Sequence, residues 1–419
     1  MSNVQVVLPD HVLESGSLCV EDGHIVEIVE GPGPEQGAGT RLDGQGLLVL
    51  PGLIDIHGDM LEREINPRPR STVPIDLALY ELDKRMVATG VTTAYAAISF
   101  AWHKEDSLRS EARAREIMET VNLMRPTLLA DHRVHARFEI TNPDAGQVLE
   151  ELLQRDQVHL ISIMDHTPGQ GQYRDIEGYV QYSVEWSQRT GENLSEEEVR
   201  SRIGMRLEQP KGWAAVRAIA DHARQHGVIL ASHDDDTVQK VELMHQLGVG
   251  ISEFPVTVEA AQTARDLGLH VAMGAPNALQ GFSTSNNLSA LDAIAAGLVD
   301  TLAADYYPAA MLHTVFAFAE QGILPLHEAV KLVTTNPADG LHLHDRGALA
   351  VGRQADLVFV EYYGANAGGS GLGLGARPRV RGTLRQGVPV YWDSYMAQLP
   401  VYQSANPDLE STQADYAGQ

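Results

Sequence analysis

A histidine and an aspartate stand two positions apart at the end of an apolar stretch. Residues 51–63 read Pro-Gly-Leu-Ile-Asp-Ile-His-Gly-Asp-Met-Leu-Glu-Arg, so a strand-like run leads directly to His57 and Asp59. Alternate side chains of a strand point to the same face, and these two would therefore project together. One nitrogen and one carboxylate donor placed in this way can hold a divalent metal ion. On its own, a triplet of this kind favours a buried histidine followed by a turn.

Further metal-type donors follow other apolar segments of the chain. Glu139, His166, His233 and Asp305 stand at or near the ends of the segments 134–140, 161–166, 228–233 and 301–305. Each of them alone could cap a helix or lie in solvent. Chance placement would scatter such donors over both ends of the strands, whereas here all of them come at the end. The joint pattern therefore indicates a metal site made of histidine and carboxylate.

The segment 134–140 carries three polar residues at alternate positions. His135, Arg137 and Glu139 would share one face of a strand, with Glu139 nearest its C-terminal end. A glutamate in that position can bridge two metal ions.

Strand-like and helix-like segments alternate through the middle of the chain. The predicted strands are 53–57, 91–99, 133–140, 159–166, 228–233, 250–254, 270–274 and 300–305. Predicted helices between them include 74–88, 108–122, 211–226, 256–267 and 288–296. This alternation predicts an α/β fold with a parallel sheet, and eight units predict a (β/α)8 TIM-like barrel over residues 51–340. Active sites of such barrels lie at the C-terminal ends of the strands, where the donors are found.

The two ends of the chain show a different sequence pattern. Short strands separated by Gly, Pro and Asp predict one discontinuous β-sandwich domain from residues 1–50 and 341–402. Residues 168–210 form a long polar insertion after a strand end, which is consistent with a lid over the barrel mouth or with a solvated insertion. The Gly-rich run 364–375 lacks the features of a phosphate loop and predicts a mobile loop. We expect the polar tail 403–419 to be disordered.

Composition and charge narrow the class of protein. The formal net charge of the 419 residues is −25, which argues against a nucleic-acid partner. Cys19 is the only cysteine, so the chain has no internal disulfide and a metal site must use histidine and carboxylate. The N-terminus lacks a signal-peptide pattern, and no apolar run is long enough to cross a membrane. We therefore expect a cytoplasmic protein without a membrane partner.

These motifs resemble those of the amidohydrolase superfamily of metal-dependent barrel hydrolases, and in particular its phosphonate-metabolism branch. The matching segments are 51–57, 57–62, 67–69, 165–170, 232–235, 253–255, 274–277, 304–308 and the closing Gly-x-x-Ala-Asp-Leu-Val of 352–358. Members of the branch hydrolyse α-D-ribose 1-methylphosphonate 5-triphosphate to the 5-phosphate and pyrophosphate. The resemblance thus implies a diphosphatase with a small anionic substrate, and we expect it to form a homodimer.

The resemblance also implies a site. It carries over His57, Asp59, Glu139, His166, His233 and Asp305 as ligands of two divalent ions, with Asp305 also accepting a proton. Zn²⁺ is the expected metal, and Mn²⁺ or Fe²⁺ would suit the same donors. Substrate contacts are expected from Arg68, Arg137, His135, Gln170 and Asn277. Further basic candidates to surround the leaving pyrophosphate are Arg63, Arg70, Arg133 and Lys104, for which ordinary salt bridges are an equal alternative.

One stretch departs from the pattern of the branch. Residues 280–287 read Gln-Gly-Phe-Ser-Thr-Ser-Asn-Asn, where the branch has an arginine and a histidine that could face phosphate. The main alternative is therefore hydrolysis of a cyclic amide, imide or exocyclic amine of a small heterocycle at the same metal site. A second alternative is a metal-free relative that assembles without catalysis.

Overall fold

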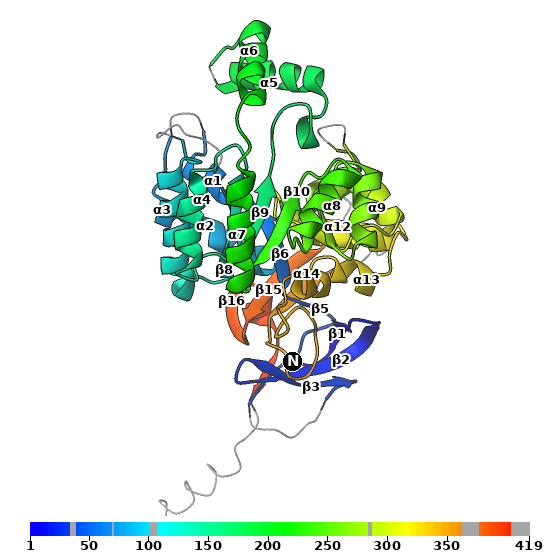
Figure 1. Ribbon diagram of the computed structural model, residues 1–419. Coiled ribbons are helices and arrows are strands. Elements are labelled where there is room, and N and C mark those ends of the chain that lie inside the picture. Colours follow the sequence, from blue (N-terminus) through cyan, green and yellow to red (C-terminus); the bar gives the residue numbers. More distant parts are fainter. Residues whose placement is uncertain are drawn as a thin grey trace, which may run out of the picture.

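Eight parallel strands form the centre of the molecule (Figure 1). The computed structural model describes residues 1–33, 39–68, 71–100, 107–190, 192–283, 287–362 and 377–403. The strands are β6 (Leu53–Gly58), β7 (Val91–Phe100), β8 (Asp131–Glu139), β9 (Leu160–Met164), β10 (Ile229–His233), β11 (Ile251–Glu253), β12 (His270–Gly274) and β13 (Thr301–Ala303). They pair in chain order, and a parallel bridge between Gly58 and Asp305 brings the last strand back to the first. The expected eight-stranded TIM-like barrel is thereby confirmed.

Helices alternate with the strands, and most of them cover the outside of this barrel (Figure 1). They are α1 (Met60–Ile65), α2 (Ile75–Ala88), α3 (Glu111–Met124), α4 (Ala145–Leu153), α7 (Trp213–Gln225), α8 (Val238–Gln246), α9 (Val258–Asp266), α10 (Ala275–Gln280), α11 (Ala290–Ala295), α12 (Ala309–Glu320), α13 (Leu326–Lys331) and α14 (Thr335–Gly340), with short 3₁₀ turns at Arg125–Thr127, Gly171–Tyr173 (η2) and Met396–Gln398. Helix α7 shows why they form, because Val216, Ile219, Ala220 and Ala223 recur at helical spacing and are buried.

A second sheet is built from both ends of the chain. Its strand order is β16-β15-β14-β5-β1-β2-β3, formed by Val388–Trp392, Arg379–Arg385, Leu357–Glu361, Leu48–Pro51, Val4–Val7, Val12–Glu21 and His24–Glu30. All neighbours are antiparallel except β1 and β5. A short ribbon joins β4 (Thr40–Leu42) to β17 (Val401–Gln403), so Gln403 is still paired. Figure 1 places this β-unit below the barrel, and the exact limits 1–50 and 341–402 stay a prediction.

Gly52 lets the chain pass from the β-unit into the barrel within one residue. It separates β5 from β6, and a Cβ atom at this position would lie 2.1 Å from Oγ1 of Thr92. Any larger residue would therefore push this junction away from Thr92 at the start of β7. The junction fixes the start of β6 and so sets the height at which His57 and Asp59 emerge.

The predicted insertion 168–210 is a helical hairpin. It consists of α5 (Ile176–Thr190) and α6 (Glu196–Leu207), with a small core of its own from Val180, Val199 and Ile203. Ser195 and Glu198 begin α6 with a capping box. Figure 1 shows the hairpin beyond the end of the barrel opposite the β-unit. Its role as a lid stays a prediction.

Two other expectations fall on residues outside the described ranges. The Gly-rich run 364–375 belongs to the undescribed stretch 363–376, and the tail from 404 onward is likewise not described.

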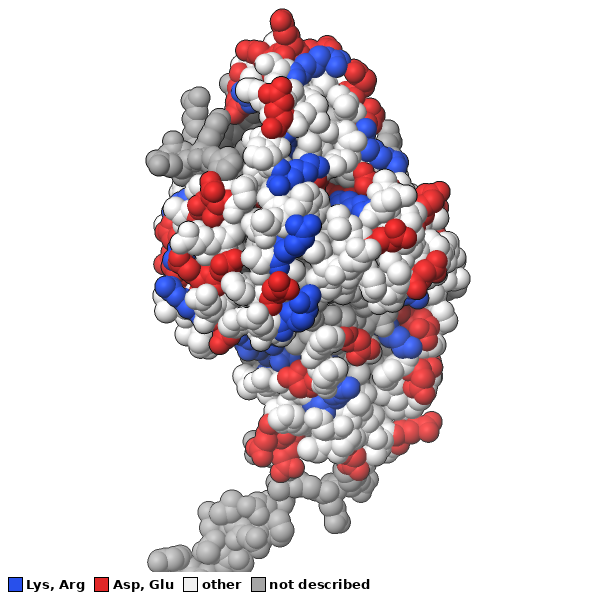
Figure 2. All heavy atoms as spheres, in the orientation of Figure 1, with Lys and Arg blue, Asp and Glu red and all other residues white. Residues whose placement is uncertain are grey.

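Among the described helices, none has the length and apolar character needed to span a membrane. Figure 2 shows acidic side chains over much of one face, interrupted by a column of basic side chains near α7.

Candidate metal centre

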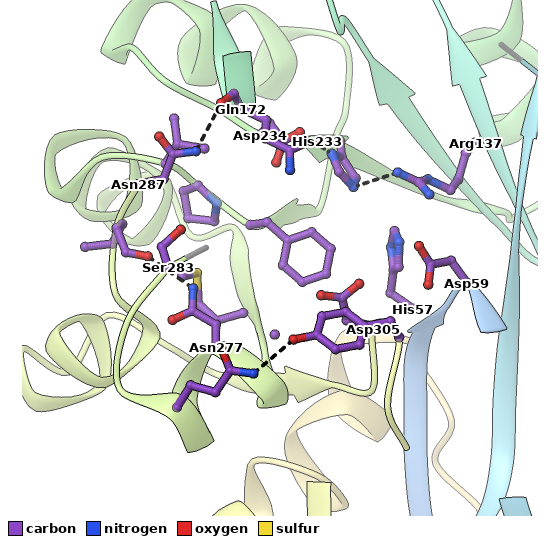
Figure 3. A pocket seen from close by; sticks show the side chains of 18 residues that line it. His57, Asp59, Arg137, Gln172, His233, Asp234, Asn277, Ser283, Asn287 and Asp305 are labelled. Carbon is purple, nitrogen blue, oxygen red and sulfur yellow. Dashed lines mark hydrogen bonds and ion pairs between the residues drawn. The ribbon is translucent and has the colours of Figure 1, made fainter. Parts of the chain in front are cut away.

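Predicted ligands from different strands meet in one pocket at the C-terminal end of the barrel (Figure 3). His57, Asp59, His233 and Asp305 line one side of it, together with Asp234 and Arg137. The other lining residues are uncharged: Gln172, Phe254, Pro255, Val256, Met273, Gly274, Asn277, Gln280, Ser283, Asn287, Leu288 and Tyr306. Gln172, Asn277, Ser283 and Asn287 lie across the pocket from His57, Asp59 and Asp305 (Figure 3). Together with Gln280 they are called the neutral wall.

Asp59 and Asp305 place two half-buried carboxylates beside each other. The backbone N–H of Asp305 donates to the carbonyl of His57 at 2.8 Å, and that of Asp59 donates to the carbonyl of Asp305 at 3.0 Å. Burial raises the pKa of Asp305 to about 7, and the charge of Asp59 adds to the effect. Burial also raises the pKa of Asp59, and its Oδ1 is buried without a hydrogen bond. Two such carboxylates side by side fit a divalent ion.

A second set of donors lies on the next part of the rim. Candidate ligand atoms of His166, His233 and Asp234 all lie within 4.8 Å of one another. Nδ1 of His166 is 2.7 Å from Oε2 of Glu139, so the predicted bridging glutamate contacts this set. Nδ1 of His233 lies 2.9 Å from Oδ2 of Asp234. Neither of these two buried atoms makes a hydrogen bond, so both are available as metal ligands.

Electrostatics keeps His57 and Asp234 in the form that binds metal. Burial, together with the nearby charge of Arg137, holds the pKa of His57 well below its usual value, so its imidazole is neutral. Burial opposes ionisation of Asp234, but His233 and His166 outweigh it and lower the pKa of that carboxyl. Neutral imidazoles and ionised carboxylates are the ligand forms of these side chains. The residues present therefore fit a divalent metal centre.

A buried chain of polar groups lies beneath the pocket. His135 and Glu253 are both fully buried, and with His57 they form another group of donor atoms within 4.8 Å. Nδ1 of His57 is 3.2 Å from Oε1 of Glu253, whose other oxygen accepts a hydrogen bond from Ser162. Nε2 of His135 is 2.5 Å from Oγ of the same serine. His135 therefore lies below the pocket and does not line it.

Three residues of the rim adopt a left-handed backbone conformation. Asp234, Phe254 and Asp305 directly follow or nearly follow β10, β11 and β13 and have φ of 54°, 55° and 53°. A bulky residue such as Phe rarely accepts this conformation, and such strain concentrates at functional sites. The ring of Phe254 packs edge-on against His57, with the ring centroids 4.9 Å apart. The local strain thus serves to place side chains at the pocket.

The predicted substrate contacts lie in different places. Arg137 and Asn277 line the pocket, and Arg137 is 3.2 Å from Nε2 of His233. Arg68 is exposed on the segment after α1 and is not among the lining residues. Gln170 is half-buried, hydrogen bonded to Lys211 and to the carbonyl of Asp165, and does not line the pocket either. Their roles stay predictions.

Three arginines surround the Asp59 carboxylate. Arg63, Arg109 and Arg137 all lower the pKa of Asp59, although burial outweighs them. Arg63 lies over the ring of the pocket residue Tyr306, and Arg109 donates to Glu62 at 2.8 Å. These arginines supply local positive charge beside the pocket of a strongly acidic protein.

The other basic candidates do not reach this pocket or are not described. Arg133 bonds Asp131 and Tyr95 near the start of β8, which is the opposite end of the barrel. Arg70 and Lys104 lie outside the described residues.

Sequence reasoning did not assign Asp234, Glu253 or Gln172 to the site. The rule that donors stand at strand ends applies to Glu253, the last residue of β11, and to Asp234, the residue after β10. Gln172 belongs to the insertion, and nothing in the sequence signals that η2 folds back to line the pocket.

The chain is similar to several known proteins. The Amidohydrolase family profile matches residues 205–391. The α-D-ribose 1-methylphosphonate 5-triphosphate diphosphatase of Escherichia coli (strain K12) is 38% identical over 366 residues, which cover 85% of this chain and 94% of that protein. A dihydroorotase of Syntrophotalea carbinolica is 23% identical over 407 residues, covering 86% of this chain and 88% of that protein.

Solved structures share the fold. The dihydropyrimidinase from Brevibacillus agri NCHU1002 superposes with a TM-score of 0.62 at 13% identity, over 96% of both chains. The 5-methylcytosine deaminase from Klebsiella pneumoniae gives 0.59 at 14% identity, over 94% of this chain and 97% of that one. At these identities the likeness shows a common fold only.

Proposed function

The chain belongs to the amidohydrolase family, and we propose that it hydrolyses α-D-ribose 1-methylphosphonate 5-triphosphate to the 5-phosphate and pyrophosphate. The observation that carries this proposal is the meeting of strand-end donors in one pocket of a chain 38% identical to the Escherichia coli diphosphatase. Hydrolysis itself follows from the family, and the substrate is the proposed part.

We propose that the pocket binds two divalent ions and that these are zinc. His57, Asp59 and Asp305, which line the pocket, would hold one of them. His233 of the pocket would hold the other together with its neighbour His166 and with Glu139, which contacts His166, and Asp234 is available to this second set. When bound, such ions polarise a phosphoryl oxygen and make water a stronger nucleophile at neutral pH. Histidine and carboxylate donors without thiolate suit Zn²⁺ and also Mn²⁺ and Fe²⁺.

The residues of the chain would have separate tasks. Asp305 lines the pocket on the rim formed where β13 returns to β6, and it would accept a proton from the attacking water. Arg137 lies beside His233 inside the pocket and would contact the phosphoryl group. Arg63 and Arg109, whose charges reach Asp59, would attract the polyphosphate chain and stabilise the leaving pyrophosphate.

One observation favours a second substrate class. The neutral wall carries the amides of Gln172, Asn277, Gln280 and Asn287 and the hydroxyl of Ser283. Such groups suit an uncharged heterocycle, so the same centre would also serve hydrolysis of a cyclic amide, imide or exocyclic amine. In the phosphonate proposal this wall holds the ribose instead.

A single product analysis separates the two. The zinc-loaded protein is incubated with the ribosyl triphosphate and, in parallel, with a panel of lactams and aminated heterocycles. Phosphorus NMR should show pyrophosphate appearing with the triphosphate substrate, while Asp305→Asn, prepared in the same way, should leave the signals unchanged. If no phosphorus signal moves and a lactam opens or ammonia is released, the heterocycle reaction takes its place.

The remaining expectations on partners and location are proposals as well. We propose that the protein works as a homodimer in the cytoplasm, without a nucleic-acid or membrane partner. A single cysteine is consistent with a reducing compartment, and a net charge of −25 repels phosphate backbones. Light scattering of the purified protein would decide the oligomeric state.

A further inference from the structure

Glu253 lies behind His57, on the side away from the pocket. It is the last residue of β11, is fully buried and does not line the pocket. His57 comes from β6, so the contact between them crosses the interior of the barrel. Their facing atoms, Oε1 of Glu253 and Nδ1 of His57, are 3.2 Å apart. Because burying an ionisable side chain is costly, its presence in this position needs an explanation.

Both oxygens of Glu253 are already engaged. Oε1 faces His57, and Oε2 accepts a short hydrogen bond from Oγ of Ser162 on β9. Ser162 in turn contacts Nε2 of His135, whose Nδ1 is 3.1 Å from the carbonyl oxygen of Ile56. The chain thus begins and ends on β6, the strand that carries His57. No side chain within it is exposed to solvent by more than 2%.

We propose that Glu253 is the positioning residue of the metal centre: it holds His57 in the tautomer and orientation that direct Nε2 at the metal. A proton on Nδ1 of His57 donates to Oε1, which leaves the lone pair of Nε2 free on the opposite side of the ring. Removing a carboxylate that orients a ligating imidazole in this way typically lowers metal affinity by about 10- to 100-fold. The inference rests on the proposed metal site and not on the proposed substrate.

The geometry offers one competing interpretation. His57, His135 and Glu253 bring three donor atoms within 4.8 Å, so a metal could sit among them inside the barrel. Replacing the Glu253 carboxylate with an amide separates a ligand role from a positioning role. Gln in place of Glu253 can still accept from Nδ1 of His57 and donate to Ser162, but it is a poor ligand for a divalent ion.

The test measures Zn²⁺ affinity by competition with a chelator, together with zinc stoichiometry per chain. Glu253→Leu should weaken zinc binding by roughly 10- to 100-fold, the range found when outer partners of metal ligands are removed. Glu253→Gln should stay within a few-fold of the unaltered protein and keep its stoichiometry. Ser162→Ala removes the hydrogen bond that Glu253 accepts on the side away from His57, so its zinc affinity should lie between those of the two Glu253 variants. It replaces Glu253→Leu in the test if Glu253→Leu does not fold.

Asp83 supplies a matched control. It is a buried carboxylate that contacts a buried histidine, with Oδ1 3.0 Å from Nε2 of His132, and it also accepts from the backbone of Leu129 and Ala130. Asp83→Asn should lower stability and leave zinc affinity unchanged. The electronic spectrum of the Co²⁺-loaded variants adds a readout of ligand geometry, which should change for Glu253→Leu and not for Asp83→Asn.

Three results would overturn the proposal. Unaltered zinc affinity in both Glu253→Leu and Ser162→Ala would remove any role for the buried chain. Loss of zinc from Glu253→Gln as complete as from Glu253→Leu, with fewer ions per chain, would make Glu253 a ligand. If the unaltered protein itself binds no zinc or cobalt, the metal site of the proposed function fails and this inference falls with it.

Discussion

Asp305 is the residue on which the proposed chemistry depends most. Its carboxylate lines the pocket beside Asp59, and its backbone bonds to that of His57. The sequence showed that a donor stands at this strand end, because an apolar strand leads to it. What the sequence could not show is the left-handed backbone at Asp305, since that conformation depends on the bridge to Gly58, nearly 250 residues earlier.

We predict that Asp305→Asn lowers turnover by about 10²- to 10⁴-fold, the usual contribution of a general base, and keeps most of the bound metal. Several other donors remain in the pocket, so the loss should appear in kcat and not in metal content. Asp300→Asn is the matched control, because Asp300 precedes the same strand and bonds Arg265 and the backbone of Val271 at its other end. Near-normal turnover of Asp305→Asn would exclude the proton-acceptor role.

His159 gives a prediction on acid stability at the other end of the barrel. Burial, with the nearby Arg125 as the next cause, lowers its pKa to about 4 in the folded protein. An unfolded histidine titrates near 6.5, so between about pH 6.5 and 4 the unfolded chain binds more protons. The free energy of unfolding should therefore fall as the pH drops through this window.

His159→Gln should flatten that fall. Urea unfolding of both proteins at several pH values, with a chelator present to remove metal effects, measures the difference. Curves of equal slope between pH 6.5 and 4 would show that His159 does not contribute.

The barrel strands were easier to predict from the sequence than the arrangement of the loops around the pocket. Each predicted barrel strand is present, with bounds shifted by no more than about three residues, because apolar periodicity and β-branched residues mark buried parallel strands. The loops that complete the pocket could not be predicted in this way. Gln172 and Asn287 approach each other across the mouth, where Nδ2 of Asn287 donates to the carbonyl of Gln172 at 3.3 Å. Contacts of this kind depend on the assembled barrel.

Asn277 is predicted to hold one of these loops in place. Its Oδ1 accepts from the backbone of Ala290 at 3.0 Å and its Nδ2 donates to the carbonyl of Leu288 at 3.3 Å, so it ties α10 to the start of α11. Asn277→Ala should raise KM several-fold with a smaller change in kcat, because each lost bond is worth about 1 kcal/mol. Hydrogen exchange should increase at residues 287–290. An unchanged KM together with unchanged exchange would contradict this role.

On the scale of the whole molecule, the two ends of the chain are tied to the closed bottom of the barrel. Arg346 is buried and contacts Oγ1 of Thr93 and Oδ2 of Asp131, each at 3.0 Å. These partners stand near the starts of β7 and β8, away from the pocket. The sequence predicted a β-unit from both ends, but a buried arginine in the 340s carries no pattern that announces this contact.

Arg346→Ala should lower the free energy of unfolding by about 2 kcal/mol, since it removes charged hydrogen bonds while Arg125 and Arg133 still accompany Asp131. Turnover at 25 °C should remain within twofold, because the contact lies at the opposite end of the barrel. Denaturant unfolding and a standard assay check both parts. A loss of turnover equal to that of Asp305→Asn would mean that the bottom contact shapes the pocket.

The proposed function requires strand-end donors that bind divalent metal, and the metal content of the purified protein tests this most directly. Elemental analysis, after the protein is stripped with a chelator and dialysed against Zn²⁺, should find at least one and up to two tightly bound ions per chain. Hydrolase activity should be lost on stripping and restored on reloading. Well under one ion per chain, with no gain in activity on adding Zn²⁺ or Mn²⁺, would contradict the account.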